Sequence, residues 1–342
     1  MFTALFGSVE LGILYAIMAL GVYLSFRVLD FPDLTVDGSF VTGAAVAAIL
    51  IVNGQSPFVA TIVAILAGFV AGCITGILHT KGGINPLLSG ILMMIALYSI
   101  NLRIMGMRSN VPLLQEQTVV TWLENGWALT RIDSFVEQLF VTIGLADFVP
   151  KTWAVVVCMA IVTILIKFVI DWFLKTEVGL ALRAVGDNKN MIRSFSANTD
   201  GLTIMGLGIS NALVALSGAL IAQYGGFADI GMGIGMIIIG LASVIIGEAI
   251  FGTKTIVRTT FAVIGGAILY RIVVAVALRI KFLETGDMKL ITAVIVIMAL
   301  ILPKIIDDWR AKRRKKQRVQ QAIQTKNLAK RGESFAPSKS DL

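Results

Sequence analysis

Apolar runs of about 20 residues follow one another along most of this chain, and each is long enough to cross the hydrocarbon core of a membrane as a helix. Hydrophobic residues make up 57% of the 342 residues and charged residues only 15%. No single soluble core could hide this much apolar surface. We therefore predict an all-α, polytopic membrane protein. About nine spans are expected from run length, near residues 2–26, 35–52, 57–79, 85–104, 151–174, 201–224, 231–252, 257–279 and 287–306.

The Lys and Arg residues of the connections predict which side of the membrane each connection faces, because cytoplasmic loops carry an excess of positive charge. They gather in residues 175–200, in the turn at 253–258 and after residue 303, so we expect these three segments to be cytoplasmic. With nine spans, the N-terminus then lies outside, the C-terminus is cytoplasmic, and segment 105–150 is external. The first run is expected to be a retained helix, since no basic segment precedes it.

We divide the chain into a membrane domain, residues 1–306, and a basic cytoplasmic tail, residues 307–342. The net charge of +8 comes mostly from this tail, which includes "KRRKKQR". No aromatic residue lies within this basic run, so we expect the tail to lie near anionic lipid headgroups and not to bind nucleic acid. The two cysteines and the single histidine indicate neither a metal site nor redox chemistry.

A polar stretch, "EVGLALRAVGDNKNMIRSFSANTDGL" at 177–202, separates two of the apolar runs. Asp187 and Asn188 are of residue types that cap helix N-termini, so we predict a short helix over residues 189–197. One face of this helix is apolar and carries Met191, Ile192 and Phe195. Such a face fits the lipid interface or a groove on a cytoplasmic partner, and an ordinary interhelical loop is the alternative; the spacing alone leaves these open.

The same stretch, continued by "LGISNALVALSGALIA" at 207–222, resembles the cytoplasmic coupling region of permease subunits of ATP-binding-cassette (ABC) importers. Two further stretches agree, "DFPDLTVDGSFVTGAAVAA" at 30–48 and "IIIGLASVIIGEAIFG" at 237–252. Over residues 1–306 the chain is similar to the branched-chain amino acid and ribose permease family of these binding-protein-dependent importers, and in particular to its tryptophan-transporter-like branch. The basic tail departs from the shorter family members.

The resemblance implies that the short helix is a coupling helix, which inserts into a groove on a separate cytoplasmic ATPase. Its contact set would be Gly186, Asp187, Asn188, Met191, Ile192, Arg193, Ser194 and Phe195. The sequence holds no G-x-x-x-x-G-K-[ST] phosphate loop. We therefore expect ATP and Mg²⁺ to be bound by the partner, and we expect this chain to be a permease that is not itself an enzyme and binds no cofactor.

The resemblance also implies an extracellular solute-binding lipoprotein, a permease homodimer and a place in the cell membrane. The solute is expected to be a small molecule, an amino acid by the family branch, and an aromatic one such as tryptophan. An ion-coupled secondary transporter is the alternative, but it needs an ion site, and we identify only three intramembrane carboxylates, Glu10, Asp37 and Glu248. An intramembrane enzyme is disfavoured because His79 is the only histidine.

Polar side chains in and beside the spans are the candidates for a translocation path. "FPDL" at 31–34 recurs as "FADI" at 227–230, which is a weak sign of an inverted repeat. The helix that begins after the first copy, together with the polar residues deeper in the spans, gives our path assignment: Asp37, Ser39, Asn85, Asn101, Asn211 and Ser217. Hydrogen bonding between helices is the alternative role for the Asn and Ser side chains.

Three acidic residues are assigned to gating or structural positions: Asp33, Asp229 and Glu248. We expect Asp33 to cap the helix that follows it, either as a plain cap at the cytoplasmic surface or beside the path. Glu248 lies near the end of an apolar run, where a carboxylate needs a partner or water. Lys254 and Arg258 are close in sequence and are expected to neutralise it.

Overall fold

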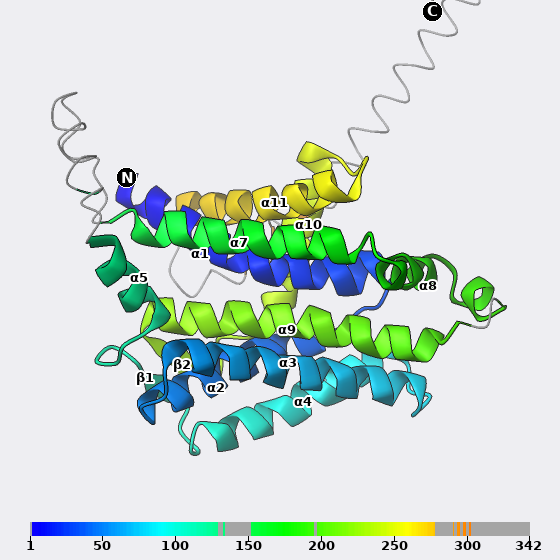
Figure 1. Cartoon of the computed structure of the whole chain (residues 1–342), viewed down its shortest axis with the longest axis horizontal. Coiled ribbons are helices and arrows are strands. Elements are labelled where there is room, and N and C mark those ends of the chain that lie inside the picture. The colour runs from blue at the N-terminus through cyan, green and yellow to red at the C-terminus, as the bar shows by residue number, and fades with distance from the viewer. Residues whose placement is uncertain are drawn as a thin grey trace, which may run out of the picture. The chain divides into compact units, whose positions relative to one another are not determined.

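The computed structural model describes residues 2–128, 133, 152–194 and 197–277, together with 290, 293–294, 297–298 and 301. It confirms the predicted all-α class (Figure 1). In chain order the elements are α1 (Phe2–Tyr23), the π-helix η1 (Leu24–Val28), α2 (Thr35–Val52), α3 (Pro57–Thr80), α4 (Pro86–Ile104), β1 (Asn110–Pro112), α5 (Val119–Ala128), α7 (Ala154–Phe173), α8 (Glu177–Ser194), α9 (Thr199–Gly225), β2 (Phe227–Asp229), α10 (Met236–Phe251) and α11 (Ile256–Ala277).

Seven of the described helices are long and apolar enough to cross a membrane: α1 with η1, α2, α3, α4, α7, α9 and α11. The polytopic class is confirmed, but the span predicted at 231–252 is wrong in length, because α10 has only 16 residues. Residues 229–236 instead form hydrogen-bonded turns, in which Gly235 has a φ of 86° that favours glycine. The run predicted at 287–306 lies almost entirely outside the described residues.

The helices divide by burial in the way expected of a protein surrounded by lipid. Most of α1, α2 and α9 is buried, whereas α3, α4, α7 and α11 each leave a large part exposed. The exposed side chains of these outer helices are long and apolar, among them Ile62, Leu66, Ile95, Leu165 and Val169. Lipid tails are as apolar as leucine, so these faces are stable in a bilayer and unstable in water.

Glycine lets the central helices α2 and α9 touch backbone to backbone. A Cβ atom added at Gly43 of α2 would overlap the carbonyl group of Ala215 in α9, and one added at Gly218 of α9 would overlap the carbonyl group of Phe40 in α2. Small residues at such crossings allow the close approach on which helix association in membranes depends. The glycine-rich runs of the sequence therefore serve packing at this crossing.

Helices α1 and α9 lie side by side in opposite directions (Figure 1). Three side chains of α9 bond to α1 in reverse order: Ser210 Oγ donates to the Gly21 carbonyl at 2.7 Å, Ser217 Oγ to the Leu14 carbonyl at 2.8 Å, and Tyr224 Oη to the Glu10 carboxylate at 2.6 Å. The reversed order of these three bonds shows that α1 and α9 are antiparallel.

The two copies of the F-x-D repeat also share their local geometry. Each is preceded by a residue in the left-handed region, Asp30 with a φ of 51° and Gly226 with a φ of 73°. In each, the aspartate accepts a hydrogen bond from the backbone N–H two residues later, at 2.9 Å for Asp33 and 2.8 Å for Asp229. Because the copies follow the antiparallel helices α1 with η1 and α9, the structure supports the inverted-repeat hypothesis.

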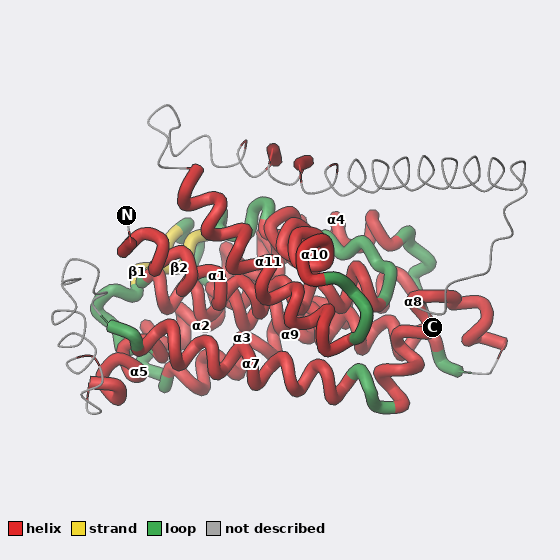
Figure 2. The backbone as a smooth tube through the Cα atoms, turned by 90° about the horizontal axis from the view of Figure 1, so that it is seen from above, coloured by secondary structure: helices red, strands yellow, loops and turns green. Residues whose placement is uncertain are grey.

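Two short strands join distant parts of the chain. In the antiparallel pair, Asn110 of β1 lies opposite Asp229 of β2, and Pro112 lies opposite Phe227. Figure 2 shows both strands together at one end of the bundle. The segment predicted to be external, 105–150, is thus attached at residues 110–112 to the connection between α9 and α10; most of its second half lies outside the described residues.

Candidate functional site

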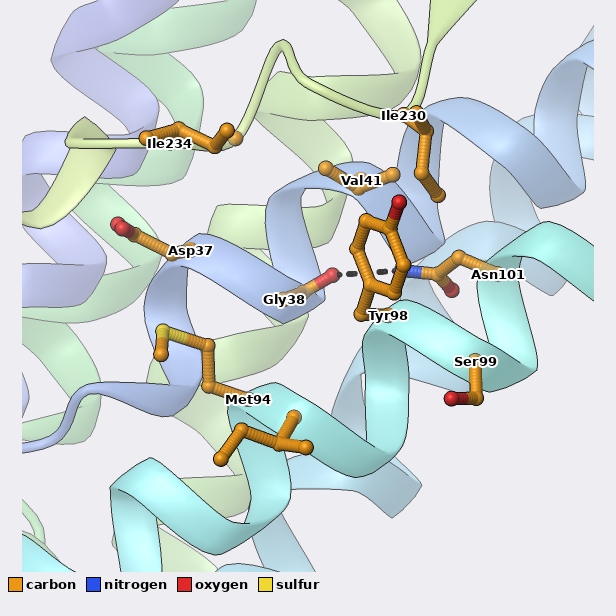
Figure 3. Close-up of a pocket in the computed structure, with 11 residues that line it drawn as sticks. Asp37, Gly38, Val41, Met94, Tyr98, Ser99, Asn101, Ile230 and Ile234 are labelled. Atoms are coloured by element: carbon orange, nitrogen blue, oxygen red, sulfur yellow. Dashed lines mark hydrogen bonds between the residues drawn. The ribbon is translucent and has the colours of Figure 1, made fainter. Parts of the chain in front are cut away.

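A cavity of about 520 Å³ lies between α2, α4 and the connection from β2 to α10 (Figure 3). Its walls are mainly apolar and come from Val41, Met94, Ile95, Ile230 and Ile234. Four polar side chains also line it: Asp37, Tyr98, Ser99 and Asn101. A mostly apolar cavity of this size with a few placed polar groups is typical of a small-molecule site.

Asp37 fixes the part of the cavity wall that comes from the second half of the chain. Its carboxylate accepts hydrogen bonds from the backbone N–H groups of Gly235 at 2.9 Å and Ile237 at 2.8 Å, where α10 begins. A carboxylate is favoured at this position because the first N–H groups of a helix have no partner within the helix and carry partial positive charge. Asp37 therefore joins α2 to the start of α10 beside the cavity.

Asn101 is held on the opposite wall by α2. Its side-chain nitrogen donates to the Gly38 carbonyl at 3.1 Å, and its side-chain oxygen accepts from the Thr42 hydroxyl at 2.9 Å. Tyr98, one turn earlier on α4, is 54% exposed, and its hydroxyl group lies toward Val41 (Figure 3). The cavity thus combines an anchored amide with an accessible aromatic ring.

The other predicted path residues lie away from this cavity. Ser39 is fully buried, and its hydroxyl has no hydrogen-bond partner among the described residues. Asn85 caps α4 by accepting from the Leu87 N–H at 3.0 Å. Asn211 donates to the Asp33 carboxylate at 2.6 Å, and Ser217 bonds to α1 as described above. The structure brings only Asp37 and Asn101 of the predicted set together at one cavity.

Asp33 sits deep in the protein and is fully buried. It accepts from the Thr35 N–H at 2.9 Å, as a cap does, and also from Asn211, which lies near the middle of α9. Next to it, the hydroxyl groups of Thr35 and Thr75 are 2.8 Å apart. A surface cap would need no such partners, so Asp33 belongs to a polar network that joins the break between η1 and α2 to α3 and α9.

The ion-pair partner of Glu248 is distant from it in the sequence. Its carboxylate forms an ion pair with Arg27 of η1, and the predicted pairing with Lys254 or Arg258 is not seen. Arg258 instead donates from Nε to the Phe251 carbonyl at 2.5 Å. The reason is the fold, which places η1 beside the end of α10, whereas Arg258 reaches back to close the turn between α10 and α11.

Helix α7 holds a buried charge pair that the sequence analysis does not predict. Lys167 and Asp171, one turn apart on α7, approach to 2.5 Å with side-chain exposures of 0% and 6%. Thr260 of α11 donates to the Asp171 carboxylate at 2.7 Å, and Lys167 Nζ lies 3.8 Å from the centre of the Phe261 ring. Asp171 therefore adds to the three intramembrane carboxylates identified from the sequence. Its i,i+4 spacing from a lysine was the signal that could have revealed it.

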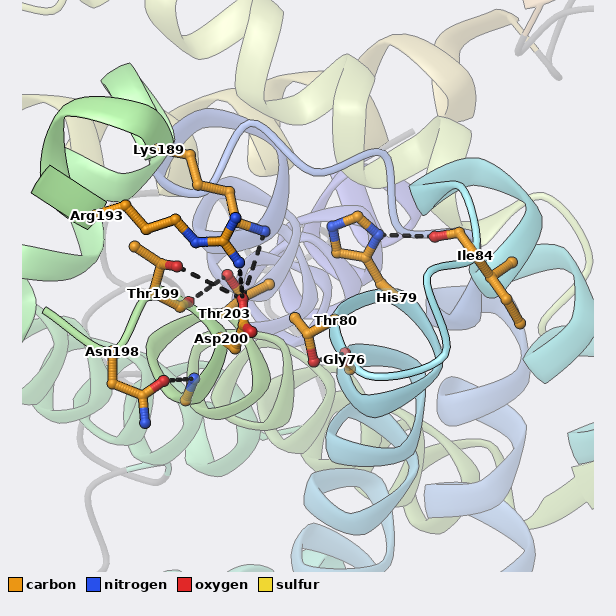
Figure 4. Close-up of polar contacts among 11 residues, drawn as sticks. Gly76, His79, Thr80, Ile84, Lys189, Arg193, Asn198, Thr199, Asp200 and Thr203 are labelled. Atoms are coloured by element: carbon orange, nitrogen blue, oxygen red, sulfur yellow. Dashed lines mark hydrogen bonds and ion pairs between the residues drawn. The ribbon is translucent and has the colours of Figure 1, made fainter. Parts of the chain in front are cut away.

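The polar stretch at 177–202 forms α8, which is interrupted at Asn188 with φ −156° and ψ 89°. The Asn188 side chain accepts from the Met191 N–H at 3.0 Å, which confirms the predicted helix start at this point. Met191 is 50% exposed, and Phe195 lies outside the described residues. In Figure 4 the side chains of Lys189 and Arg193 converge on Asp200 at the start of α9, at 3.9 and 3.6 Å.

These features define a class of protein. It is a multi-pass membrane protein with a cavity of solute size beside the start of α10. The chain belongs to the family described as branched-chain amino acid transport system, permease component, whose model matches residues 4–302. This confirms the resemblance to ABC permeases seen in the sequence.

Two curated relatives match over most of the chain. One is the protein named tyrosine transport system permease protein of Clostridioides difficile (strain R20291), which is 44% identical over 288 residues, covering 84% of this chain and 87% of that protein. The other is an uncharacterized protein of Rickettsia prowazekii (strain Madrid E), 35% identical over 290 residues, covering 83% of this chain and 91% of that protein. No solved structure matches the chain.

Proposed function

We propose that this chain is the membrane permease of an ATP-driven importer that carries an aromatic amino acid into the cytoplasm. The observation that carries the proposal is the 44% identity over 288 residues to a permease named for tyrosine transport. The similarity covers 84% of this chain and 87% of that protein. Tyrosine and tryptophan are both candidate solutes, since each presents a planar ring and a polar amino acid group.

The cavity beside Asp37 supports this choice of solute. At about 520 Å³ it falls inside the range of about 300–1,000 Å³ typical of small-molecule sites. Its apolar walls suit a ring, the exposed ring of Tyr98 offers a stacking partner, and the Asn101 amide keeps one N–H and one oxygen lone pair beyond its bonds to α2. Under the proposal, Asp37 and Asn101 lie on the translocation path, and the Arg27–Glu248 pair closes its cytoplasmic end.

The partners follow from the transport class. We propose a separate cytoplasmic ATPase that binds ATP and Mg²⁺, an extracellular solute-binding lipoprotein, and a second copy of this chain across a central path. The short helix after Asn188 is the proposed contact with the ATPase. A Cβ atom at Gly186 would overlap the Val28 carbonyl of η1, and Lys189 and Arg193 pair with Asp200 of α9. Movement of α8 would therefore be transmitted to η1, which continues α1, and to α9.

Replacing Met191 with aspartate is expected to remove most of the ATPase that co-purifies with this chain. Met191 is a half-exposed apolar side chain on the short helix, and a charge at an apolar anchor of an interface costs about 2–4 kcal/mol of binding, or a thirtyfold or greater loss. The measurement is a pull-down of the detergent-solubilised chain from its native membrane, followed by identification of co-purifying proteins.

The matched control is Met107→Asp, which places the same charge at a side chain that is 70% exposed beyond the end of α4. This variant should retain the ATPase at equal expression. Recovery of the ATPase with both variants would exclude the short helix as the contact. If wild type recovers no ATPase even after crosslinking, the importer proposal fails and an ion-coupled secondary transporter becomes the better account.

A further inference from the structure

A second cavity, separate from the one beside Asp37, lies between η1, α8 and the turn from α10 to α11. Its volume is about 600 Å³, and its lining is strongly polar. The charged residues at this cavity are Arg27, Arg183, Glu248 and Lys254. Three of these four side chains are cationic, which is unusual for groups that share one cavity, because like charges at short range repel one another.

Among the described residues, only one of the three cations has an ion-pair partner. Glu248 forms its ion pair with Arg27, and among the described residues no carboxylate lies within ion-pair distance of Arg183 or Lys254. The cavity therefore carries a net charge of about +2 when its three cations and one carboxylate are all ionised. An anion bound between Arg183 and Lys254 would relieve this repulsion.

The remaining wall offers further donors for an anion with several oxygens. Thr253, Thr255 and Thr259 line the cavity, and α11 begins there at Ile256. The Thr259 hydroxyl donates to the Thr255 carbonyl at 3.0 Å, and the Thr255 hydroxyl accepts from the Arg258 N–H at 3.3 Å, so the Thr253 and Thr255 hydroxyl groups are the ones left to donate to an anion. Helix N-termini present unpaired N–H groups and favour negative charge. Arginine binds phosphate through two parallel N–H groups, and lysine binds it as a compact charge. The cavity thus provides both kinds of cation that bind phosphate together with neutral hydroxyl groups.

Two exposed apolar side chains directly precede the turn that lines the cavity. Ile250 and Phe251, at the end of α10 directly before the turn, are 60% and 41% exposed. An anionic phospholipid would meet cationic groups at its phosphate and apolar side chains along its acyl chains. We propose that this cavity binds a phosphate group, supplied either by the headgroup of an anionic phospholipid or by free phosphate.

The test measures the thermal unfolding midpoint of the detergent-solubilised full chain while a probe is added. The lipid probe is dioctanoyl phosphatidylglycerol, with dioctanoyl phosphatidylcholine as its zwitterionic reference. The free probe is potassium phosphate, with potassium chloride at equal ionic strength as its reference. Saturable binding raises the midpoint and yields an apparent Kd for each probe.

The variant is Arg183→Gln with Lys254→Gln, and Lys254→Gln alone is included because this side chain is exposed and its replacement leaves packing intact. The matched control is Lys81→Gln with Lys175→Gln. Both lysines are exposed and lie outside the cavity, and replacing them lowers the net charge by the same amount. Wild type and control should bind alike. Each cation removed from the cavity should weaken the apparent Kd about tenfold.

The two probes distinguish the source of the phosphate group. A shift with phosphatidylglycerol alone identifies a lipid site, and a shift with potassium phosphate shows that the phosphate group is sufficient. The proposal is overturned if neither probe raises the midpoint of wild type, or if the double cavity variant binds the probes as tightly as the lysine control.

Discussion

Replacing Lys167 with alanine is expected to destabilise the protein by about 3–5 kcal/mol, the largest loss of stability that any single substitution discussed for this chain should cause. The ion pair with Asp171 has side-chain exposures of 0% and 6%. Without its lysine, the carboxylate would remain buried against α11 with Thr260 as its remaining side-chain partner. Taking an unpaired charge out of water costs several kcal/mol, and an apolar surrounding offers no compensation.

The measurement is equilibrium unfolding of the purified protein by sodium dodecyl sulfate in mixed micelles. Lys167→Met combined with Asp171→Leu should recover most of the loss, because removing both charges leaves no unpaired group. Arg193→Ala, which breaks the exposed pair with Asp200, should change stability by less than about 1 kcal/mol. Equal effects of Lys167→Ala and Arg193→Ala would show that the α7 pair is hydrated and not buried.

Replacing Asp37 with alanine is expected to lower solute transport about tenfold or more. Each hydrogen bond to a charged acceptor contributes about 1.5–3 kcal/mol, and 1.4 kcal/mol corresponds to a factor of ten. Asp37 accepts two such bonds from Gly235 and Ile237. Their loss frees the start of α10 from α2 and displaces the cavity wall that carries Ile234. Transport is measured as uptake of radiolabelled aromatic amino acid at equal expression.

Asp37→Asn should lie between wild type and Asp37→Ala, since one acceptor oxygen remains. Asn53→Ala is the control, because Asn53 is exposed and directly follows the far end of α2, and it should transport as wild type does. If Asp37→Ala transports as well as wild type, the hydrogen bonds between α2 and the start of α10 are not needed for transport through this cavity.

The class of fold could be predicted from the sequence because apolar runs of spanning length admit few other structures in a membrane. The predicted helices at 35–52 and 57–79 agree with α2 and α3 to within a residue. The start of α10 could not be placed in the same way, because its run continues through residues 231–235 without losing apolar character. The turns at Gly233 and Gly235 decide where that helix begins, and the Asp37 carboxylate accepts hydrogen bonds from the Gly235 and Ile237 N–H groups there.

The candidate site was predictable only where a polar residue stands out against its apolar neighbours. Asp37 and Asn101 stand out in this way, and both line the cavity. Tyr98 does not, since aromatic residues are common in membrane helices and only the packing of α4 against α2 shows that its ring reaches a cavity. The partner of Glu248 is likewise a tertiary contact, since 221 residues separate it from Arg27.

The most direct test of the proposed function is uptake of L-tyrosine and L-tryptophan by native cells, with the gene present, deleted and restored. Ionophores collapse the proton and sodium gradients while glycolysis maintains ATP. The account predicts that at least one of these amino acids still enters cells that carry the gene and no longer enters the deletion strain. Uptake that depends on the gene but disappears when the gradients collapse would contradict an ATP-driven importer and identify an ion-coupled transporter.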